Sequence, residues 1–295
     1  MKVALFHNPK AGNGTFKVSD FVRSIENAGH KVLYVSIKAK DWREAFCEHI
    51  DRVIVAGGDG SVSRISPWLA ARSLPFSILP LGTANNCARS LGQTHTAETI
   101  ITNLGSADQT KVDLDLITTP AGQRSFLESA GVGLLPRFMS IMQNLQKKNG
   151  SKFRSLAGER LAHAKKYLRS MAKDISTFGC EVLLDNENIS GDFLLLEVAN
   201  MGLIGPSLSL ATTVDPGDGL LDVVWVRRES RKEWLRYLKH FRPDEETPAP
   251  FEHRQCRRIT FRRADVPWHI DGKVFPEIVN PCCATIYPGA LQLIG

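Results

Sequence analysis

The chain has 295 residues, of which 43% are hydrophobic and 23% are charged, and its formal net charge is +6. This is the composition of an ordinary globular protein, and no apolar run approaches the roughly 18 residues that would cross a bilayer. The N-terminal residues do not resemble a signal peptide, and the six cysteines are scattered without a CxxC pair, so we expect a cytoplasmic protein with reduced thiols.

The first third of the chain alternates strand-like and helix-like patterns. Short runs rich in Val, Ile and Leu predict strands at residues 3–6, 31–37, 52–56 and 77–81, and helical spacing predicts helices at 19–28 and 42–50. Strands that alternate with helices indicate a parallel sheet covered on both faces. Because ligands of such sheets bind at the carboxyl ends of the strands, the turns that follow the strands are the candidate site.

The segment RVIVAGGDGSVSRI, residues 52–65, places three glycines around one acid directly after a predicted strand. Glycines let a phosphate chain lie against bare backbone N–H groups, and the helix start that follows favours an anion. Asp59 would then contact a metal ion or a ribose hydroxyl rather than a phosphate. The alternative is a tight strand-to-helix turn in which Asp59 is a cap.

Two further polar turns follow predicted strands in the same way. LPLGTANNCARSLG, residues 79–92, presents the hydroxyl of Thr83 and the amides of Asn85 and Asn86 before another helix start, and NPKAGNG, residues 8–14, follows the first strand. Polar turns at the carboxyl ends of strands in one parallel sheet predict a nucleotide cleft.

From about Asp113 the chain changes to longer extended runs, which predict a mainly antiparallel second domain. Strand-like segments lie at residues 126–130, 180–184, 192–199, 220–226 and 258–262, one helix covers residues 161–171, and residues 243–250 predict an exposed loop. We therefore expect domains at 1–120 and 121–283, with residues 284–295 as a candidate return to the first domain.

The three turns, in this order, resemble those of the diacylglycerol kinase catalytic-domain family, which includes sphingosine kinases and bacterial lipid kinases. The resemblance continues through VANMGLIGPSLSLATTVDPGDGLLDVVWV, residues 198–226, and HIDGKVF, residues 269–275, and so covers nearly the whole chain. It implies an α/β nucleotide-binding domain with a parallel sheet, like those of NAD kinase and phosphofructokinase, and a mainly β sandwich second domain. It also implies an active site in the cleft between them.

The resemblance implies roles for individual residues as well. The ATP site would be lined by Asn8, Pro9, Lys10, Ala11, Gly12, Ser36, Gly57, Gly58, Asp59, Gly60, Ser61 and Thr83, together with Asn85 and Asn86. Asp271 matches the general base that takes a proton from the lipid hydroxyl. Asp215, Asp218 and Leu220 match the positions that hold a structural Mg²⁺, the first and last through backbone carbonyls, which a hard cation accepts as ligands. Asp113 is either an acid behind the metal ligands or a hydrogen-bonded structural acid.

The sequence departs from the family's pattern at three places. Ser63 and Arg64 replace the usual Asn-Glu, Asn86 stands where Asp is common, and Lys273 replaces the Glu that follows Asp-Gly in the catalytic motif. At positions 64 and 273 two acids are lost and two cations are gained, which weakens any metal site that used those acids. Lys273 could instead be a catalytic contact to the ATP phosphates. His269, beside the candidate base, is a weaker candidate for a catalytic dyad.

The segment RRESRKEWLRYLKHF, residues 227–241, lies in the most basic part of the chain, since residues 227–263 hold 12 Lys and Arg against six Asp and Glu. Apolar residues recur at helical spacing among the cations: Trp234, Leu235, Leu238 and Phe241 among Arg231, Lys232, Arg236 and Lys239. Such a helix can lie in a membrane interface, so we expect the lipid substrate to be met at a membrane surface. The alternative is that the apolar stripe covers the sheet of the second domain.

These observations predict an ATP- and Mg²⁺-dependent lipid kinase that phosphorylates a hydroxyl of diacylglycerol or a related lipid. We expect no nucleic-acid partner, and a homodimer stays open. An NAD kinase-like enzyme is one alternative, although DPGDGLLDVV and the TANN turn favour the lipid family. A catalytically weak lipid- or nucleotide-binding protein is the other, and Lys273 and Arg64 favour it.

Overall fold

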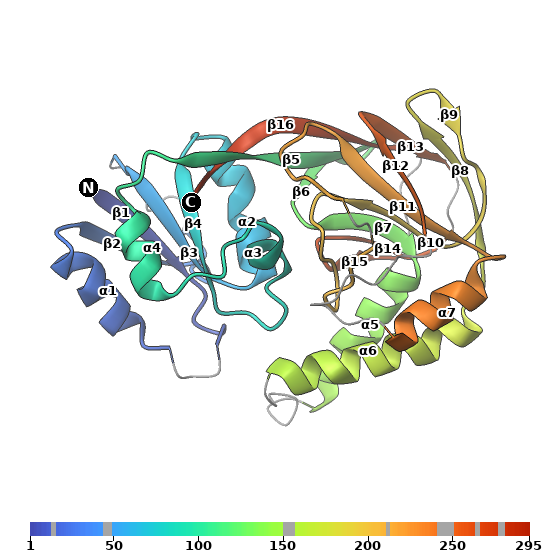
Figure 1. Ribbon diagram of the computed structural model, residues 1–295, viewed down its shortest axis with the longest axis horizontal. Helices are drawn as coiled ribbons and strands as arrows, with labels where there is room; N and C mark the ends of the chain where they lie inside the picture. The colour runs from blue at the N-terminus through green and yellow to red at the C-terminus, as the bar shows by residue number, and fades with distance from the viewer. Residues whose placement is uncertain are drawn as a thin grey trace. The chain divides into compact units, whose positions relative to one another are not determined.

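The structure is a computed structural model, and it describes residues 1–12, 16–43, 49–149, 157–210, 213–240, 251–262, 266–276 and 281–295. The chain divides into two compact units, Met1–Val112 with Gly289–Gly295, and Asp113–Pro288 (Figure 1). Strands β5 (Gln109–Thr119) and β16 (Cys282–Ile294) each begin in one unit and end in the other. Within the described residues, no helix combines the length and the apolar character that crossing a membrane requires.

The first unit is built on a parallel sheet. Its strands are β1 (Lys2–His7), β2 (Lys31–Ser36), β3 (Arg52–Gly57), β4 (Pro75–Pro80) and the end of β16, in the order β2-β1-β3-β4-β16. β1, β3 and β4 are buried along nearly their whole length, as expected for strands covered on both faces. The predicted parallel sheet is therefore confirmed.

Helices cover both faces of this sheet: α1 (Val18–Asn27), α2 (Asp59–Ala70), α3 (Asn86–Ser90) and α4 (Ala97–Asn103). Val3 and Leu5 share a core cluster with α1 and α4, whereas Phe6 packs edge-on against Trp68 of α2 with ring centroids 5.2 Å apart. This alternation follows from the period of two along a strand. The predicted helix at 42–50 lies mostly outside the described residues, and residues 41–43 form a turn.

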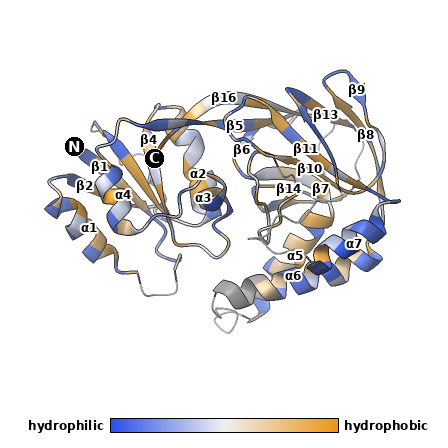
Figure 2. Ribbon diagram, in the orientation of Figure 1, coloured by the Kyte–Doolittle hydropathy of each residue, from blue (hydrophilic) through white to orange (hydrophobic). Residues whose placement is uncertain are grey.

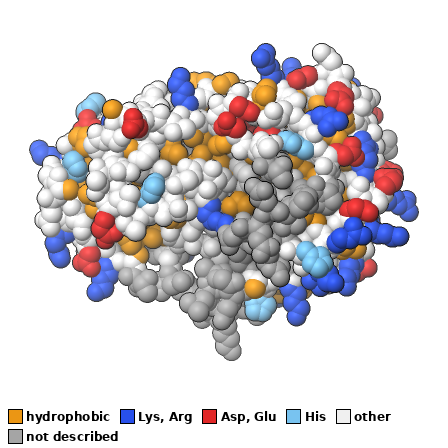
Figure 3. Space-filling model, viewed as in Figure 1, with side chains coloured by type: hydrophobic (Ala, Val, Ile, Leu, Met, Phe, Trp, Pro, Cys, Tyr) orange, Lys and Arg blue, Asp and Glu red, His pale blue; other side chains and the backbone are white. Residues whose placement is uncertain are grey.

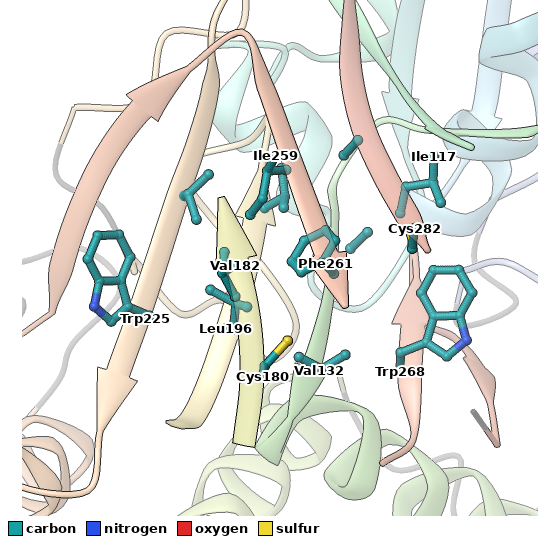
Figure 4. Packing of buried hydrophobic residues seen from close by; sticks show 14 of the residues in the cluster. Ile117, Val132, Cys180, Val182, Leu196, Trp225, Ile259, Phe261, Trp268 and Cys282 are labelled. Atoms are coloured by element: carbon teal, nitrogen blue, oxygen red, sulfur yellow. The ribbon is translucent and has the colours of Figure 1, made fainter. Parts of the chain in front are cut away.

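The second unit is a sandwich of two antiparallel layers. One layer contains β15 (Lys273–Phe275), β14 (Trp268–Ile270), β7 (Ser129–Gly133), β10 (Gly191–Ala199), β11 (Leu221–Arg227) and β12 (Glu252–Cys256). The other contains β9 (Glu187–Asn188), β8 (Phe178–Leu184), β13 (Arg258–Arg262), the start of β16, β5 and β6 (Gly122–Phe126). Figure 4 shows side chains of both layers meeting in the core, among them Val132, Leu196 and Phe261.

Three helices cover the outer face of the first layer: α5 (Leu134–Asn149), α6 (Ala157–Asp174) and α7 (Arg231–His240). Figure 2 shows α5 largely hydrophobic and α7 largely hydrophilic. The helices expected at 161–171 and within 227–241 correspond to α6 and α7, whereas α5 was not predicted. Pro136 lies in the first turn of α5, where a proline is tolerated because the N–H groups there have no intrahelical acceptor.

The apolar stripe of α7 packs against the sheet, as the alternative interpretation of that segment had it. Trp234 and Tyr237 are buried, and their rings stack with centroids 5.7 Å apart. Arg231 donates hydrogen bonds to the carbonyls of Ala172, Lys173 and Ile175 at 3.3, 3.0 and 2.6 Å. It therefore caps the C-terminal end of α6, and it is not a free surface cation. Phe241 and the loop predicted at 243–250 lie outside the described residues.

Candidate active site

The turn after β3 is shaped by close backbone approach. A Cβ on Gly57 would collide with the Ser61 hydroxyl, and a Cβ on Gly58 would lie 2.8 Å from the Cα of Gly82. Both positions therefore need glycine. Helix α2 begins at Asp59 with Gly58 as its N-cap residue and no side chain capping it, so the first N–H groups of a 12-residue helix follow a turn of bare backbone, a setting that favours anions.

The turn after β4 is held by its own side chain. Asn85 adopts a left-handed conformation with φ of 51°, its Oδ1 accepts the Gly82 N–H at 2.8 Å, and its amide donates to the Gly82 carbonyl at 3.2 Å. Asn85 thus shapes the turn. Thr83 is half-buried within it, and the buried Asn86 begins α3.

The turn after β1 links to both of these. The Gly12 N–H donates to the Leu81 carbonyl at 2.7 Å, and the Asn8 amide donates to the Ser61 hydroxyl at 3.3 Å. The Asn8 Oδ1 also accepts the Lys10 N–H at 3.1 Å, while Pro9 and Lys10 are exposed. The three predicted nucleotide turns are therefore in mutual contact.

The remaining predicted nucleotide residues lie at the same edge of the sheet. Ser36 ends β2, and its hydroxyl accepts the Lys38 N–H at 3.3 Å. Asp59 is half-buried, and its Oδ1 accepts the Cys87 N–H at 2.9 Å. Its carboxylate therefore has a structural partner at the start of α3, and its contact to a metal stays a prediction.

In the second unit, Asp271 occupies the two-residue turn between β14 and β15. Asp271 and Gly272 have φ of 44° and 72°, which is the pattern of a type I′ hairpin turn and explains the Asp-Gly sequence. The Asp271 carboxylate accepts three consecutive backbone N–H groups, those of Leu127, Glu128 and Ser129, at 2.9, 2.8 and 3.2 Å. These three donors hold the side chain in one orientation.

His269 does not form a dyad with Asp271. The His269 ring is fully buried, and its Nε2 lies 3.0 and 3.1 Å from the two carboxylate oxygens of Glu197. Its Nδ1 accepts the Gly272 N–H at 3.4 Å. The sequence analysis missed Glu197, although a charged residue in the middle of the apolar run FLLLEVA was a signal, because a buried charge needs a partner.

Lys273 follows the turn and is exposed. Its ammonium lies 5.3 Å from the ring centroid of Phe275, and the guanidinium of Arg124 lies at the same distance from that ring. The other cation that departs from the family's pattern, Arg64, lies 5.6 Å from the ring centroid of Trp42 in the first unit. Both replacements therefore have aromatic contacts of their own.

The predicted Mg²⁺ residues lie on a tight loop before β11. The Asp218 carboxylate accepts the Leu220 N–H at 2.9 Å and the Gln255 amide at 2.8 Å, and the Asp218 N–H lies 3.4 Å from the Asp215 carbonyl. The atoms that this loop offers to a metal are carboxylate and carbonyl oxygens, the ligands that a hard cation prefers. In the described part of the chain, Asp215 and Asp218 belong to no group of three His, Cys, Asp or Glu ligand atoms, so a cation would depend on carbonyls and water.

Asp113 of β5 is hydrogen-bonded to this loop. Its buried carboxylate accepts the Gly219 N–H at 2.8 Å, and its own N–H donates to the Pro216 carbonyl at 2.7 Å. Two residues along β5, Asp115 is also fully buried, and neither of its carboxylate oxygens has a hydrogen-bond partner. Burial first, then the nearby carboxylates of Asp113, Asp271 and Asp222, raise the pKa of Asp115 well above its ordinary value.

Two family models match the chain. Residues 2–117 match the model described as the diacylglycerol kinase catalytic domain. Residues 150–295 match the model described as the YegS C-terminal NAD kinase beta sandwich-like domain. Together they account for most of the chain, and the second also includes Gly289–Gly295, which belong to the first unit.

Curated bacterial proteins are similar over most of their length. A Mycobacterium tuberculosis protein named diacylglycerol kinase is 25% identical over 318 residues, covering 99% of this chain and 94% of the relative. A Bacillus subtilis diacylglycerol kinase is 24% identical over 251 residues, covering 80% and 77%. A Shewanella frigidimarina protein named probable lipid kinase YegS-like is 24% identical over 310 residues, covering 98% and 92%.

Solved structures show the same fold. A diacylglycerol kinase from Bacillus anthracis gives a TM-score of 0.73 at 20% identity, covering 99% of this chain and 96% of that chain. The expectation of an α/β part followed by a β sandwich is thus confirmed.

Proposed function

We propose that the chain transfers the γ-phosphate of ATP to a hydroxyl of diacylglycerol or a related lipid, because residues 2–117 match the diacylglycerol kinase catalytic-domain model and bacterial relatives carry the name diacylglycerol kinase. The observation that carries this proposal is the mutual contact of the turns after β1, β3 and β4, where Gly58 and Gly82 keep side chains away from the backbone. A phosphate chain needs such access to N–H groups.

In this proposal the first unit holds the nucleotide. The turn at Gly57–Gly60 and the start of α2 would bind the phosphates, and the exposed Lys10 would add a positive charge beside them. Ser36 and Thr83 would offer hydroxyls to the nucleoside. Asp59 would face the cation that accompanies ATP while its other contact, with the Cys87 N–H, keeps α2 and α3 together.

The second unit would supply the base. The Asp271 carboxylate, ionised and fixed by three N–H donors, would accept the proton of the lipid hydroxyl as the oxygen attacks the γ-phosphorus and ADP leaves. Phosphoryl transfer depends mainly on positioning and charge neutralisation, and a base within hydrogen-bond reach adds roughly 10²–10⁴-fold.

A divalent cation fits two places by donor chemistry. Mg²⁺ bound with ATP would neutralise the charge that develops on the transferred phosphoryl group. A second, structural Mg²⁺ would be held by Asp215, Asp218 and Leu220, whose oxygens suit a hard cation, and it would fix the loop that Asp113 already contacts.

We also propose that the lipid is met at a membrane surface. Lys232, Arg236 and Lys239 of α7 are exposed, and Figure 3 shows Lys and Arg side chains gathered over the end of the second unit where α7 lies. Exposed cations are attracted to anionic head groups, each by about 1 kcal/mol. Because the apolar side chains of α7 are buried in the second unit, the helix would bind the membrane through its exposed cations.

The test is an assay with radiolabelled ATP and a panel of lipids in mixed micelles, with NAD as a separate acceptor. Labelled lipid that requires both Mg²⁺ and the protein supports the proposal, and labelled NAD phosphate would replace it with an NAD kinase. A second candidate, a lipid- or nucleotide-binding protein with weak turnover, is favoured by Lys273 at the position of the usual acid. Binding of ATP without transfer to any acceptor would favour that candidate.

A further inference from the structure

Glu197 and His269 meet across a strand that carries no side chain between them. Glu197 on β10 and His269 on β14 are both in register with Gly131 on β7. A Cβ on Gly131 would collide with the Glu197 carboxylate, so only glycine leaves room for the two side chains to touch. The His269 Nε2 lies 3.0 and 3.1 Å from the two Glu197 oxygens.

This pair is costly to keep in the interior. Both side chains are fully buried, and Glu197 stands between the core residues Leu196 and Val198. In other proteins, substituting hydrophobic residues of similar volume for a buried charged pair often leaves the folded state equally stable. The proposed chemistry uses neither residue, so the pair has no role in the proposal as it stands.

The second ring nitrogen of His269 connects the pair to the proposed base. Nδ1 accepts the Gly272 N–H at 3.4 Å, which requires the proton of a neutral ring to sit on Nε2, facing Glu197. Gly272 is the second residue of the turn whose first residue is Asp271. The Gly272 carbonyl is held as well, since it accepts the Gln143 amide at 3.0 Å.

We propose that Glu197 and His269 are positioning residues for the reaction: Glu197 fixes the tautomer and orientation of His269, and His269 holds the Asp271–Gly272 turn. The inference rests on the proposed function, in which Asp271 is the base. The three N–H donors orient the Asp271 carboxylate from β7 and the residues before it, and the imidazole accepts the backbone N–H of the next residue, Gly272. A shift of the turn would misplace the base, and a displacement of about 1 Å can cost roughly 100-fold in rate.

The first experiment uses the wild-type protein and needs no turnover. The ¹⁵N chemical shifts of the His269 ring should show Nε2 protonated and Nδ1 unprotonated, and the Gly272 amide should exchange slowly with solvent. A protonated Nδ1 would overturn the inference, because it could not accept from Gly272. Rapid exchange of the Gly272 amide would overturn it as well.

Three variants then test the consequence. In His269→Gln the amide can still reach Glu197 but loses the acceptor for Gly272, and in Glu197→Leu the ring loses its anchor. In both variants the Gly272 amide should exchange with solvent about tenfold faster than in the wild type. Both should also lose about 10- to 100-fold in kcat, while KM for ATP stays within about twofold of the wild-type value. Glu197→Gln keeps an oxygen for the Nε2 proton and should retain both properties.

Val198→Ala is the matched control, because it opens a cavity in the sandwich core, on the face of β10 opposite to Glu197, and lowers the melting temperature without touching the turn. If it reduces kcat as much as His269→Gln does, the pair serves stability alone and the inference is wrong. If the wild-type protein phosphorylates no lipid, the proposed function fails. In that case the ring shifts and amide exchange still decide whether the pair holds the turn.

Discussion

The Asp59 carboxylate accepts the Cys87 N–H at 2.9 Å, so one side chain joins the first turn of α2 to the first turn of α3. The Cys87 N–H bonds to Oδ1, an oxygen that asparagine also has. Asp59→Asn therefore separates this hydrogen bond from the proposed role of the charge.

Asp59→Asn should leave the fold intact and abolish stabilisation by ATP. The amide oxygen can still accept from Cys87, whereas the charge that would face the cation of the nucleotide is gone. We expect an unchanged melting temperature without nucleotide and no upward shift with Mg²⁺-ATP, measured by thermal unfolding. Asp20→Asn, on the exposed face of α1, is the control for loss of one acid. If Mg²⁺-ATP raises the melting temperature of Asp59→Asn as much as that of the wild type, Asp59 is not part of the nucleotide site.

Asp271→Asn should abolish lipid phosphorylation and destabilise the second unit. The proposed base is lost, which should cost about 10²–10⁴-fold, and an amide presents an NH₂ group to some of the three backbone donors. Leaving one such donor without an acceptor costs about 1–3 kcal/mol. Chemical unfolding measures the stability, and the thermal shift with ATP should persist. Turnover at the wild-type rate would place the base on another residue.

Lys273→Glu should raise lipid phosphorylation several-fold if Asp271 is the base, because it restores the acid that the resemblance places beside Asp271. The change also gives up the contact of the ammonium with the Phe275 ring, worth about 0.5–1 kcal/mol at an exposed site. Lys273→Gln removes the charge without adding an acid and controls for that loss. A rise in KM for ATP in both variants would show that the lysine contacts the phosphates.

Replacing Lys232, Arg236 and Lys239 with Gln should reduce co-sedimentation with anionic vesicles without lowering the melting temperature. Each cation contributes about 1 kcal/mol near an anionic leaflet, and the binding should weaken with salt because the charges are exposed. Replacing the exposed lysines Lys31, Lys38 and Lys40 of the first unit is the matched control. Equal sedimentation of the α7 variant and the wild-type protein would exclude this face.

Arg231→Gln should behave differently from the other α7 variants. Arg231 donates to three carbonyls at the end of α6, so its loss should lower the melting temperature whether or not vesicles bind. An unchanged melting temperature would show that the cap contributes nothing measurable.

Asp115→Asn should flatten the pH dependence of stability. Burial raises the pKa of Asp115 well above its ordinary value of 3.8, so the folded protein retains a proton that the unfolded chain releases. Its contribution is therefore least unfavourable below 3.8, and stability falls as the pH rises toward the folded-state pKa, by about 1.4 kcal/mol per pH unit. Urea unfolding between pH 4 and pH 7 should show the variant gaining stability relative to the wild type as the pH rises. Parallel curves would mean that Asp115 is ionised in the folded state.

The sequence by itself determined the features that depend on neighbouring residues. The glycines at 57, 58 and 60 predicted a turn of bare backbone after a buried strand, because only glycine permits that approach. The alternation of apolar strands and helices was enough for the parallel sheet of the first unit, since a strand buried on both faces must be covered by helices.

The tertiary structure alone decided which distant side chains meet. Glu197 and His269 are 72 residues apart, and Asp113 and Gly219 are 106 residues apart. Each pair depends on the register of several strands at once, and a slip of one residue would turn every side chain of a strand to the opposite face. For the same reason, the composition of α7 was compatible with a helix that binds a membrane and with a helix that covers a sheet. Only the structure shows that its apolar side packs against β10 and β11. Register and packing are properties of the whole folded unit, so no local pattern could have specified them.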